Sequence, residues 1–127
     1  MNAKQYRTII PGELREAVTG HARAVIEGNE ASAEGWVEGP ALEGYRTALK
    51  QAAEIRPLRN FELIAHARLG FQFIVKVRFQ GAGSNLPLQV RWRRQNGSGW
   101  RIVEAENLNE HSPWRKPDKT KPINADA

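Results

Sequence analysis

The first half of the chain carries apolar residues at helical spacing. The first stripe recurs at intervals of three or four residues and consists of Leu14, Val18, His21 and Val25. It predicts a helix near 12–27, which Pro11 can begin and Gly28-Asn29 can end. Similar spacing predicts a short helix over 30–37 and a longer one over 40–54.

After Pro57 the apolar positions alternate with polar ones, which is the spacing of half-buried strands. We predict four strands, within the ranges 61–67, 71–80, 86–93 and 100–103. Short glycine-containing loops between them favour an antiparallel meander over about 59–107 with one apolar face. The sequence therefore predicts the α+β class, with N-terminal helices packed on the concave face of a curved sheet of four or more strands.

Strand register follows from keeping the apolar side chains on one face, because a shift of one residue inverts every side chain. The expected opposite pairs are Phe61–Val77, Leu63–Val75 and Ala65–Phe73 in the first hairpin, Val75–Val90 and Phe73–Trp92 in the second, and Trp92–Ile102 in the third. The first hairpin then closes through the loop 68–70 and the second through a loop near 81–84. The third needs a three-residue loop, in which a glycine within 96–99 adopts a positive φ.

Length, composition and charge narrow the domain organisation and the chemistry that the chain can have. The chain has 127 residues, is 40% hydrophobic and carries a net charge of +5. It can therefore form one domain, which we place at 11–114. Residues 1–10 form a lead-in, and the basic, proline-containing segment 115–127 is expected to be mobile. The absence of cysteine excludes disulfides, thiol nucleophiles and cysteine-built metal sites.

Membrane and metal chemistry are not expected. No apolar run approaches the roughly 20 residues of a membrane helix, and residues 1–11 lack the apolar centre of a signal peptide. We therefore expect a cytoplasmic location, with a leader or anchor removed before Met1 as the open alternative. The histidines His21, His66 and His111 have no short ligand spacing, so neither a metal nor a cofactor is expected.

The order of the predicted elements resembles a known family. A helix with a Gly-Asn stop, a short helix, a longer helix and strands ending in Gly99-Trp100-Arg101-Ile102-Val103 are similar to the cone-shaped nuclear transport factor 2-like superfamily, over about residues 11–108. That superfamily includes ketosteroid isomerase, scytalone dehydratase, polyketide cyclases and many uncharacterised bacterial domains. The resemblance implies a cavity between helices and sheet, a two-fold dimer through the outer sheet face, and an uncharacterised bacterial member.

One departure from the family concerns catalysis. Enzyme members usually carry a short strand and an acidic loop between the second and third helices, where this chain has only residues 36–42. The chain also has no aspartate before Asp118. The aspartate base and the protonated aspartate of ketosteroid isomerase therefore have no matching residues here.

Three side chains are nevertheless candidates for acid–base catalysis. His21 lies in the apolar stripe of the first helix, and an imidazole with a pKa near 6.5 suits a general base. Glu104 follows Trp100 and Ile102 by strict alternation, so we expect it on the concave face with a raised pKa, and Tyr45 could donate a proton. The alternatives are a core histidine with one partner and a Glu104 returned to solvent by a strand bulge.

The remaining candidates concern binding. The expected cavity is lined by Trp36, Phe73, Trp92 and Arg94, although aromatic residues at core spacing often simply fill the core. On the outward face the register aligns one row, Ile64, Ile74, Arg91 and Val103, which we predict to be the interface of a homodimer. Isolated exposed apolar residues are the alternative. The same register places Glu62 opposite Lys76, Gln72 opposite Arg93, and an exposed His66 across from Gln72.

The charge is uneven along the chain, with nine basic and four acidic residues over 56–114. Basic side chains on the outward face would attract phosphates or acidic proteins. No aromatic residues interleave them for base stacking, so we do not expect a nucleic-acid partner.

Three functional hypotheses follow from the sequence. The favoured one is a non-catalytic domain that binds a small apolar ligand or a protein partner and dimerises through its sheet. The alternative is an enzyme of the isomerase, dehydratase or cyclase type, which acts on a small apolar substrate through His21 or Glu104 with Tyr45. A third is an electrostatic adaptor for nucleic acid or an acidic partner.

Overall fold

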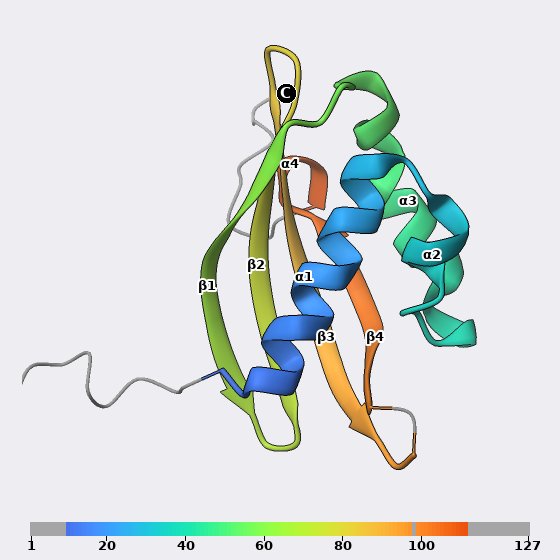
Figure 1. Cartoon of the computed structure of the whole chain (residues 1–127), viewed down its shortest axis with the longest axis vertical. Helices are drawn as coiled ribbons and strands as arrows, with labels where there is room; N and C mark the ends of the chain where they lie inside the picture. Colours follow the sequence, from blue (N-terminus) through green and yellow to red (C-terminus); the bar gives the residue numbers. More distant parts are fainter. Residues whose placement is uncertain (1–9, 98, 112–127) are drawn as a thin grey trace, which may run out of the picture.

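The computed structural model describes residues 10–97 and 99–111 (Figure 1). Its elements are α1 (Gly12–Glu27), α2 (Glu30–Glu34), the 3₁₀ turn η2 (Gly39–Ala41), α3 (Leu42–Glu54), β1 (Asn60–Leu69), β2 (Gln72–Gln80), β3 (Asn85–Gln95), β4 (Gly99–Asn107) and α4 (Leu108–His111). The predicted α+β class is confirmed, with helices followed by an antiparallel sheet of order β1-β2-β3-β4. Residues 1–9 of the lead-in expected over 1–10, and the tail expected over 115–127, lie outside the described residues.

The helices begin and end where their local chemistry requires. Gly28 ends α1 in the left-handed conformation, at φ 75°, and its N–H donates to carbonyls of the last turn. The side chain of Asn29 then accepts a hydrogen bond from the backbone of Ser32 and begins α2. The helix predicted over 30–37 ends early because Val37 leaves it to form a parallel bridge with Ile102 of β4.

The predicted registers are confirmed for the second hairpin and for the part of the third hairpin that is next to its turn, and the two hairpins share β3. Phe73 lies opposite Trp92, and Trp92 lies opposite Ile102. The third hairpin has the expected three-residue loop between Gln95 and Gly99, with a positive φ of 81° at Gly97 inside the loop and of 70° at Gly99 after it. Because apolar and polar residues alternate without interruption in β2 and β3, the sequence predicts the pairing of these two central strands correctly.

The predicted register of the first hairpin is wrong. Phe61 pairs with Phe79 instead of Val77, and Leu63 pairs with Val77 instead of Val75. The hairpin closes through the two residues between Leu69 and Gln72, which leaves no room for the expected three-residue loop. A bulge at Ile64 then shifts the register again, because the extra residue stands opposite no partner.

A second bulge, at Val103 of β4, inverts the remainder of that strand. Arg91 pairs with Glu104, whereas Trp92 pairs with Ile102, so one residue of β4 is left over. Beyond each bulge the alternation continues with the opposite parity. The bulges therefore decide which side chains of the two edge strands enter the core.

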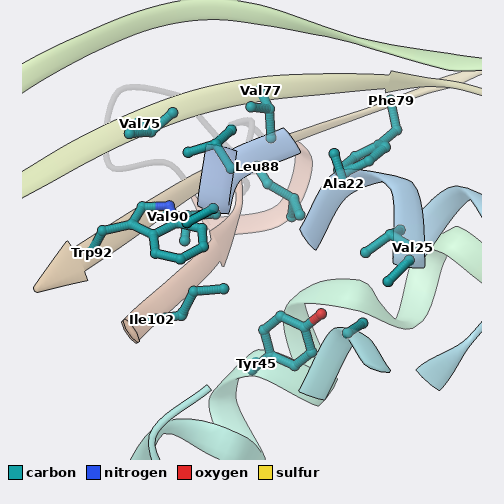
Figure 2. Close-up of a cluster of buried hydrophobic side chains, with 14 of the residues drawn as sticks. Ala22, Val25, Tyr45, Val75, Val77, Phe79, Leu88, Val90, Trp92 and Ile102 are labelled. Atoms are coloured by element: carbon teal, nitrogen blue, oxygen red, sulfur yellow. The ribbon is translucent and has the colours of Figure 1, made fainter. Parts of the chain in front are cut away.

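The helices cover the concave face of the curved sheet, and the core lies between them (Figures 1 and 2). Its fully buried side chains include large residues from helix and sheet, among them Leu14, Phe79, Leu88, Trp92 and Ile102. Trp92 is only 1% exposed. The packing therefore fills the centre of the concave face with side chains.

Candidate functional site

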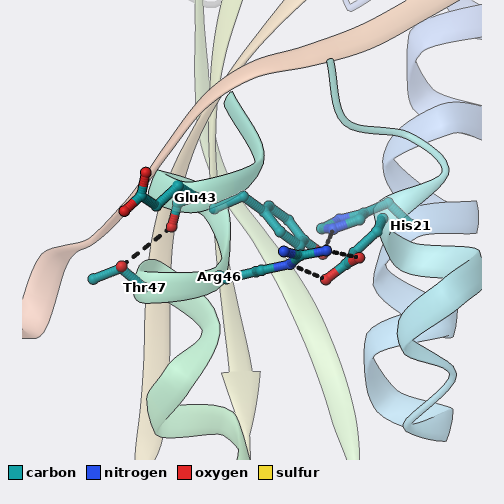
Figure 3. A network of polar contacts seen from close by, with 6 residues as sticks. His21, Glu43, Arg46 and Thr47 are labelled. Atoms are coloured by element: carbon teal, nitrogen blue, oxygen red, sulfur yellow. Dashed lines mark hydrogen bonds and ion pairs between the residues drawn. The ribbon is translucent and has the colours of Figure 1, made fainter. Parts of the chain in front are cut away.

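His21 and Tyr45 form a buried polar pair between α1 and α3 (Figure 3). Nε2 of His21 lies 2.7 Å from the hydroxyl oxygen of Tyr45, and both residues are 3% exposed. The imidazole also packs edge-on against the indole of Trp92, with ring centroids 6.1 Å apart. Two of the three predicted catalytic residues thus do meet in the core.

Burial shifts both pKa values away from neutrality. Desolvation lowers the pKa of His21 from 6.5 to about 4, because the charged imidazolium loses its hydration. Burial, with the negative charges of Glu34 and Glu30 adding to it, raises the pKa of Tyr45 well above its usual value. Both side chains are therefore neutral at pH 7 and share a neutral hydrogen bond. This is the environment of a core histidine with one satisfied nitrogen.

Glu104 does not reach the concave face, so the sequence expectation was wrong. The bulge at Val103 turns its side chain outward, where it is 63% exposed and accepts a hydrogen bond of 2.9 Å from Arg91. His21 and Glu104 consequently lie on opposite sides of the sheet. They cannot act together on one substrate.

The cavity expected beneath Trp92 is filled. Trp92 packs edge-on against Trp36 at 6.1 Å, in addition to His21, and Phe73 packs against Trp100 at 5.8 Å. Arg94 lies outside the core, 63% exposed, in an ion pair of 3.5 Å with Glu13. Of the four predicted pocket residues, only Trp36 and Arg94 border an open hollow of about 680 Å³, beside the β3–β4 loop.

The predicted apolar row on the outer face does not form. Ile74 does lie opposite Arg91, but its neighbour on β1 is Ala67 instead of Ile64, and the row ends at Glu104 instead of Val103. Ile64 and Val103 are displaced because each occupies a bulge.

The ionic pattern of this face also differs in part. Gln72 lies opposite Arg93 as predicted, but Glu62 lies opposite Arg78 instead of Lys76 and forms an ion pair with it. His66 was expected on the outer face opposite Gln72. It pairs with Val75, so it shares the concave side, and it is half-buried. Its Nδ1 is buried and has no hydrogen-bond partner within the described part of the chain.

A groove of about 430 Å³ between α1, α2 and α3 was not predicted from the sequence. Its apolar wall is built from four alanines, two branched aliphatic side chains and one aromatic ring: Ala24, Val25, Ala33, Tyr45, Leu49, Ala52 and Ala53. Alanines leave space between helices that larger residues would fill. The signal was present as alanines in all three helices, but alanine is also the best helix former, so it did not distinguish a groove.

The rim of the groove is charged. Arg46 makes two hydrogen bonds of 2.8 Å to the carboxylate of Glu34, which closes one part of the rim (Figure 3). Arg56 donates to the carbonyls of Val25 and Ile26 at the end of α1. Lys50 lines the same groove and forms no ion pair with the described residues. An apolar wall with an unpaired cation at its rim can accommodate a largely apolar molecule that carries a polar group.

Within residues 10–97 and 99–111 no three histidines or carboxylates lie close enough together to hold a metal ion. In the same ranges no helix has both the length and the apolar character needed to cross a membrane. Comparison of the sequence with protein-family models and with curated proteins gave no match.

Proposed function

We propose that this chain is a non-catalytic binding domain that holds a small, mainly apolar ligand in the groove between α1, α2 and α3. The observation that carries this proposal is the groove itself, an alanine-walled space of about 430 Å³ beside a fully packed core. Sites for small molecules typically enclose about 300–1,000 Å³ and are mostly apolar with a few polar groups. The groove has that size and composition.

The same contacts support a non-catalytic role. A general base is most effective when its pKa is near the working pH, whereas the pKa of His21 is about 4. The hydroxyl of Tyr45 is engaged with that histidine, and the carboxylate of Glu34 is engaged with Arg46. The alternative of an isomerase, dehydratase or cyclase would require one of these groups to be released when substrate binds.

Two further parts of the proposal concern the family and the oligomeric state. We assign the chain to the nuclear transport factor 2-like superfamily as a bacterial member, supported by three helical segments followed by a four-stranded meander. We also propose a homodimer through the outer sheet face, where Ile74 and Val103 are only partly buried. Sedimentation equilibrium checks this second point, because a chain that stays monomeric at high concentration does not have this dimer.

Binding in the groove can be tested with an apolar fluorescent anion, 1-anilinonaphthalene-8-sulfonate. Ala53 lines the groove yet is exposed on α3, so Ala53→Trp can fill the space without crowding the core. The matched control is Ala31→Trp, at an exposed position of α2 that does not line the groove. We expect saturable binding by the wild type and by the control, and a loss of roughly tenfold or more in affinity for Ala53→Trp.

Thermal unfolding of the three proteins accompanies the titration. Equal melting temperatures show that the Ala53→Trp variant has kept the fold, so its loss of dye affinity comes from filling the groove. If the wild type fails to bind the dye in a saturable manner, or if both tryptophan variants bind it equally well, the groove is not a ligand site.

A further inference from the structure

The large exposed apolar side chains of the described residues gather in one hairpin. Phe71 is 90% exposed, Leu69 is 49% exposed and Ile64 is 45% exposed. Phe71 lies in the tight turn between β1 and β2, at the lower end of the sheet in Figure 1, and Leu69 immediately precedes that turn. Gly70 supplies the positive φ of 59° that the turn needs. A phenylalanine at such a tip has almost no contact with its own domain, although burying it would be favourable by hydrophobic transfer.

Basic side chains surround this tip. Arg68 precedes the turn, and its Nε donates to the carbonyl of Gly70 at 3.1 Å. On the outer face, Leu69, Gln72 and Arg93 lie in one cross-strand row. Arg93 is exposed and forms no ion pair with the described residues.

The acidic side chains of the outer face do not neutralise this region. Glu62 is paired with Arg78, and Glu104 is paired with Arg91. Glu106 lies in the row of Lys76 and Gln89, further from the turn than Arg93. Arg68 and Arg93 therefore stand beside the apolar tip without an ion-pair partner among the described residues.

We propose that the β1–β2 turn docks on an anionic lipid surface, with Phe71 and Leu69 inserted at the interface and with Arg68 and Arg93 among the headgroups. Interfacial binding of this kind combines buried apolar area with attraction between cations and anionic lipids. A single aromatic ring projecting from a tight turn has no fixed surface around it for a partner protein to match. A fluid interface accepts such a projection without shape complementarity.

The charge distribution favours an anionic lipid surface over a second copy of the chain as the partner of the turn. Two copies that met tip to tip through the turn would bring Arg68 of each close to Arg68 of the other, which is unfavourable. An anionic surface is complementary to Arg68 and to Arg93. The ligand groove lies near the end of α1 marked by Gly28, at the opposite end of that helix from the turn, so the two sites are independent (Figure 1).

The test measures sedimentation of the full chain with vesicles. One set is pure phosphatidylcholine, and the other contains about 30% phosphatidylglycerol. We expect binding to the anionic vesicles, weaker binding as salt rises from low to physiological concentration, and little binding to the neutral set. Phe71→Ser is expected to reduce affinity by roughly tenfold or more, since burying a phenylalanine contributes about one such factor or more.

Matched variants separate a specific tip from general stickiness. Ile64→Ser removes an exposed apolar side chain in the middle of β1, away from the turn, and is expected to leave vesicle affinity unchanged. Arg93→Gln is expected to weaken binding by about fivefold, whereas Arg23→Gln, on an exposed position of α1, is expected to have no effect.

Three results overturn the proposal. The first is no sedimentation with anionic vesicles at low salt, which would leave an acidic protein as the partner to search for. The second is equal binding by the wild type and Phe71→Ser, which would reduce the interaction to net charge alone. The third is an equal loss of affinity in Ile64→Ser and Phe71→Ser, which would show that the whole face of the hairpin binds the vesicles and not the turn alone.

Discussion

The buried His21–Tyr45 pair makes the stability of this domain depend on acid in a specific way. In the folded state the imidazole resists protonation until about pH 4, whereas in the unfolded chain it takes up a proton near 6.5. Between these values the unfolded state binds the proton and the folded state does not. Stability is therefore fully present above 6.5 and is lost as the pH falls from 6.5 towards 4.

The size of the effect follows from the two pKa values. The difference between 6.5 and about 4 corresponds to about 3–4 kcal/mol, at about 1.4 kcal/mol for each tenfold change in proton affinity. That is a large fraction of the roughly 5–15 kcal/mol by which a domain is stable. His21 alone should thus account for a visible part of acid unfolding.

The assay compares urea unfolding near pH 7 and near pH 4.5 for the wild type and for the double variant His21→Leu/Tyr45→Phe. Replacing both partners of a buried hydrogen bond with apolar residues can be nearly neutral, whereas Tyr45→Phe alone leaves an unpaired nitrogen and costs about 1–3 kcal/mol at pH 7. Between the two pH values the wild type should lose about 2–3 kcal/mol more than the double variant.

A control that keeps the imidazole isolates the cause. Tyr45→Phe leaves His21 in its buried site, so this variant should keep the acid sensitivity of the wild type. If the double variant and the wild type lose equal free energy between the two pH values, then His21 is not held neutral by burial, and the reasoning is wrong.

Two further predictions concern packing and charge. A Cβ added at Gly81 would meet the carbonyl oxygen of Ile55, so Gly81→Ala should destabilise the fold by about 2 kcal/mol. Gly44→Ala, in open space on α3, should stabilise it by about 0.5–1 kcal/mol, both measured by urea unfolding. Glu104→Gln should change the free energy of unfolding by less than about 1 kcal/mol, because its ion pair with Arg91 is largely exposed. A larger loss in that measurement would place Glu104 in a dry environment, as strict alternation had suggested.

The parts of the fold that the sequence predicted well are those with an uninterrupted period. The helix near 12–27 carries a continuous stripe from Leu14 to Val25 and ends at a glycine, so little else could form there. β2 and β3 alternate without interruption, and their register is correct along the whole ladder. Where local pattern and burial agree at every position, the pattern alone is sufficient.

The parts that failed share one cause. A bulge inserts a residue without a sequence signal, since Ile64 and Val103 are ordinary strand residues. Each bulge then inverts the parity of all that follows, which moved His66 to the concave side and Glu104 to the outside. The single residue at position 103 therefore removed Glu104 from the candidate catalytic residues, whereas His21 and Tyr45 still meet in the core.

The groove and the exposed turn escaped prediction for a different reason. Both features consist of residues that leave space or stay exposed. The helices α1 and α3 leave space because the residues between them are alanines. Phe71 stays exposed because the first hairpin closes in two residues. Periodicity reports which side chains face the core, but it does not report whether the core has room for them. With the expected loop at 68–70, Phe71 would have begun the inward face of β2. The register of one turn therefore leaves the first residue of the strand predicted over 71–80 as the most exposed large apolar side chain of the described domain.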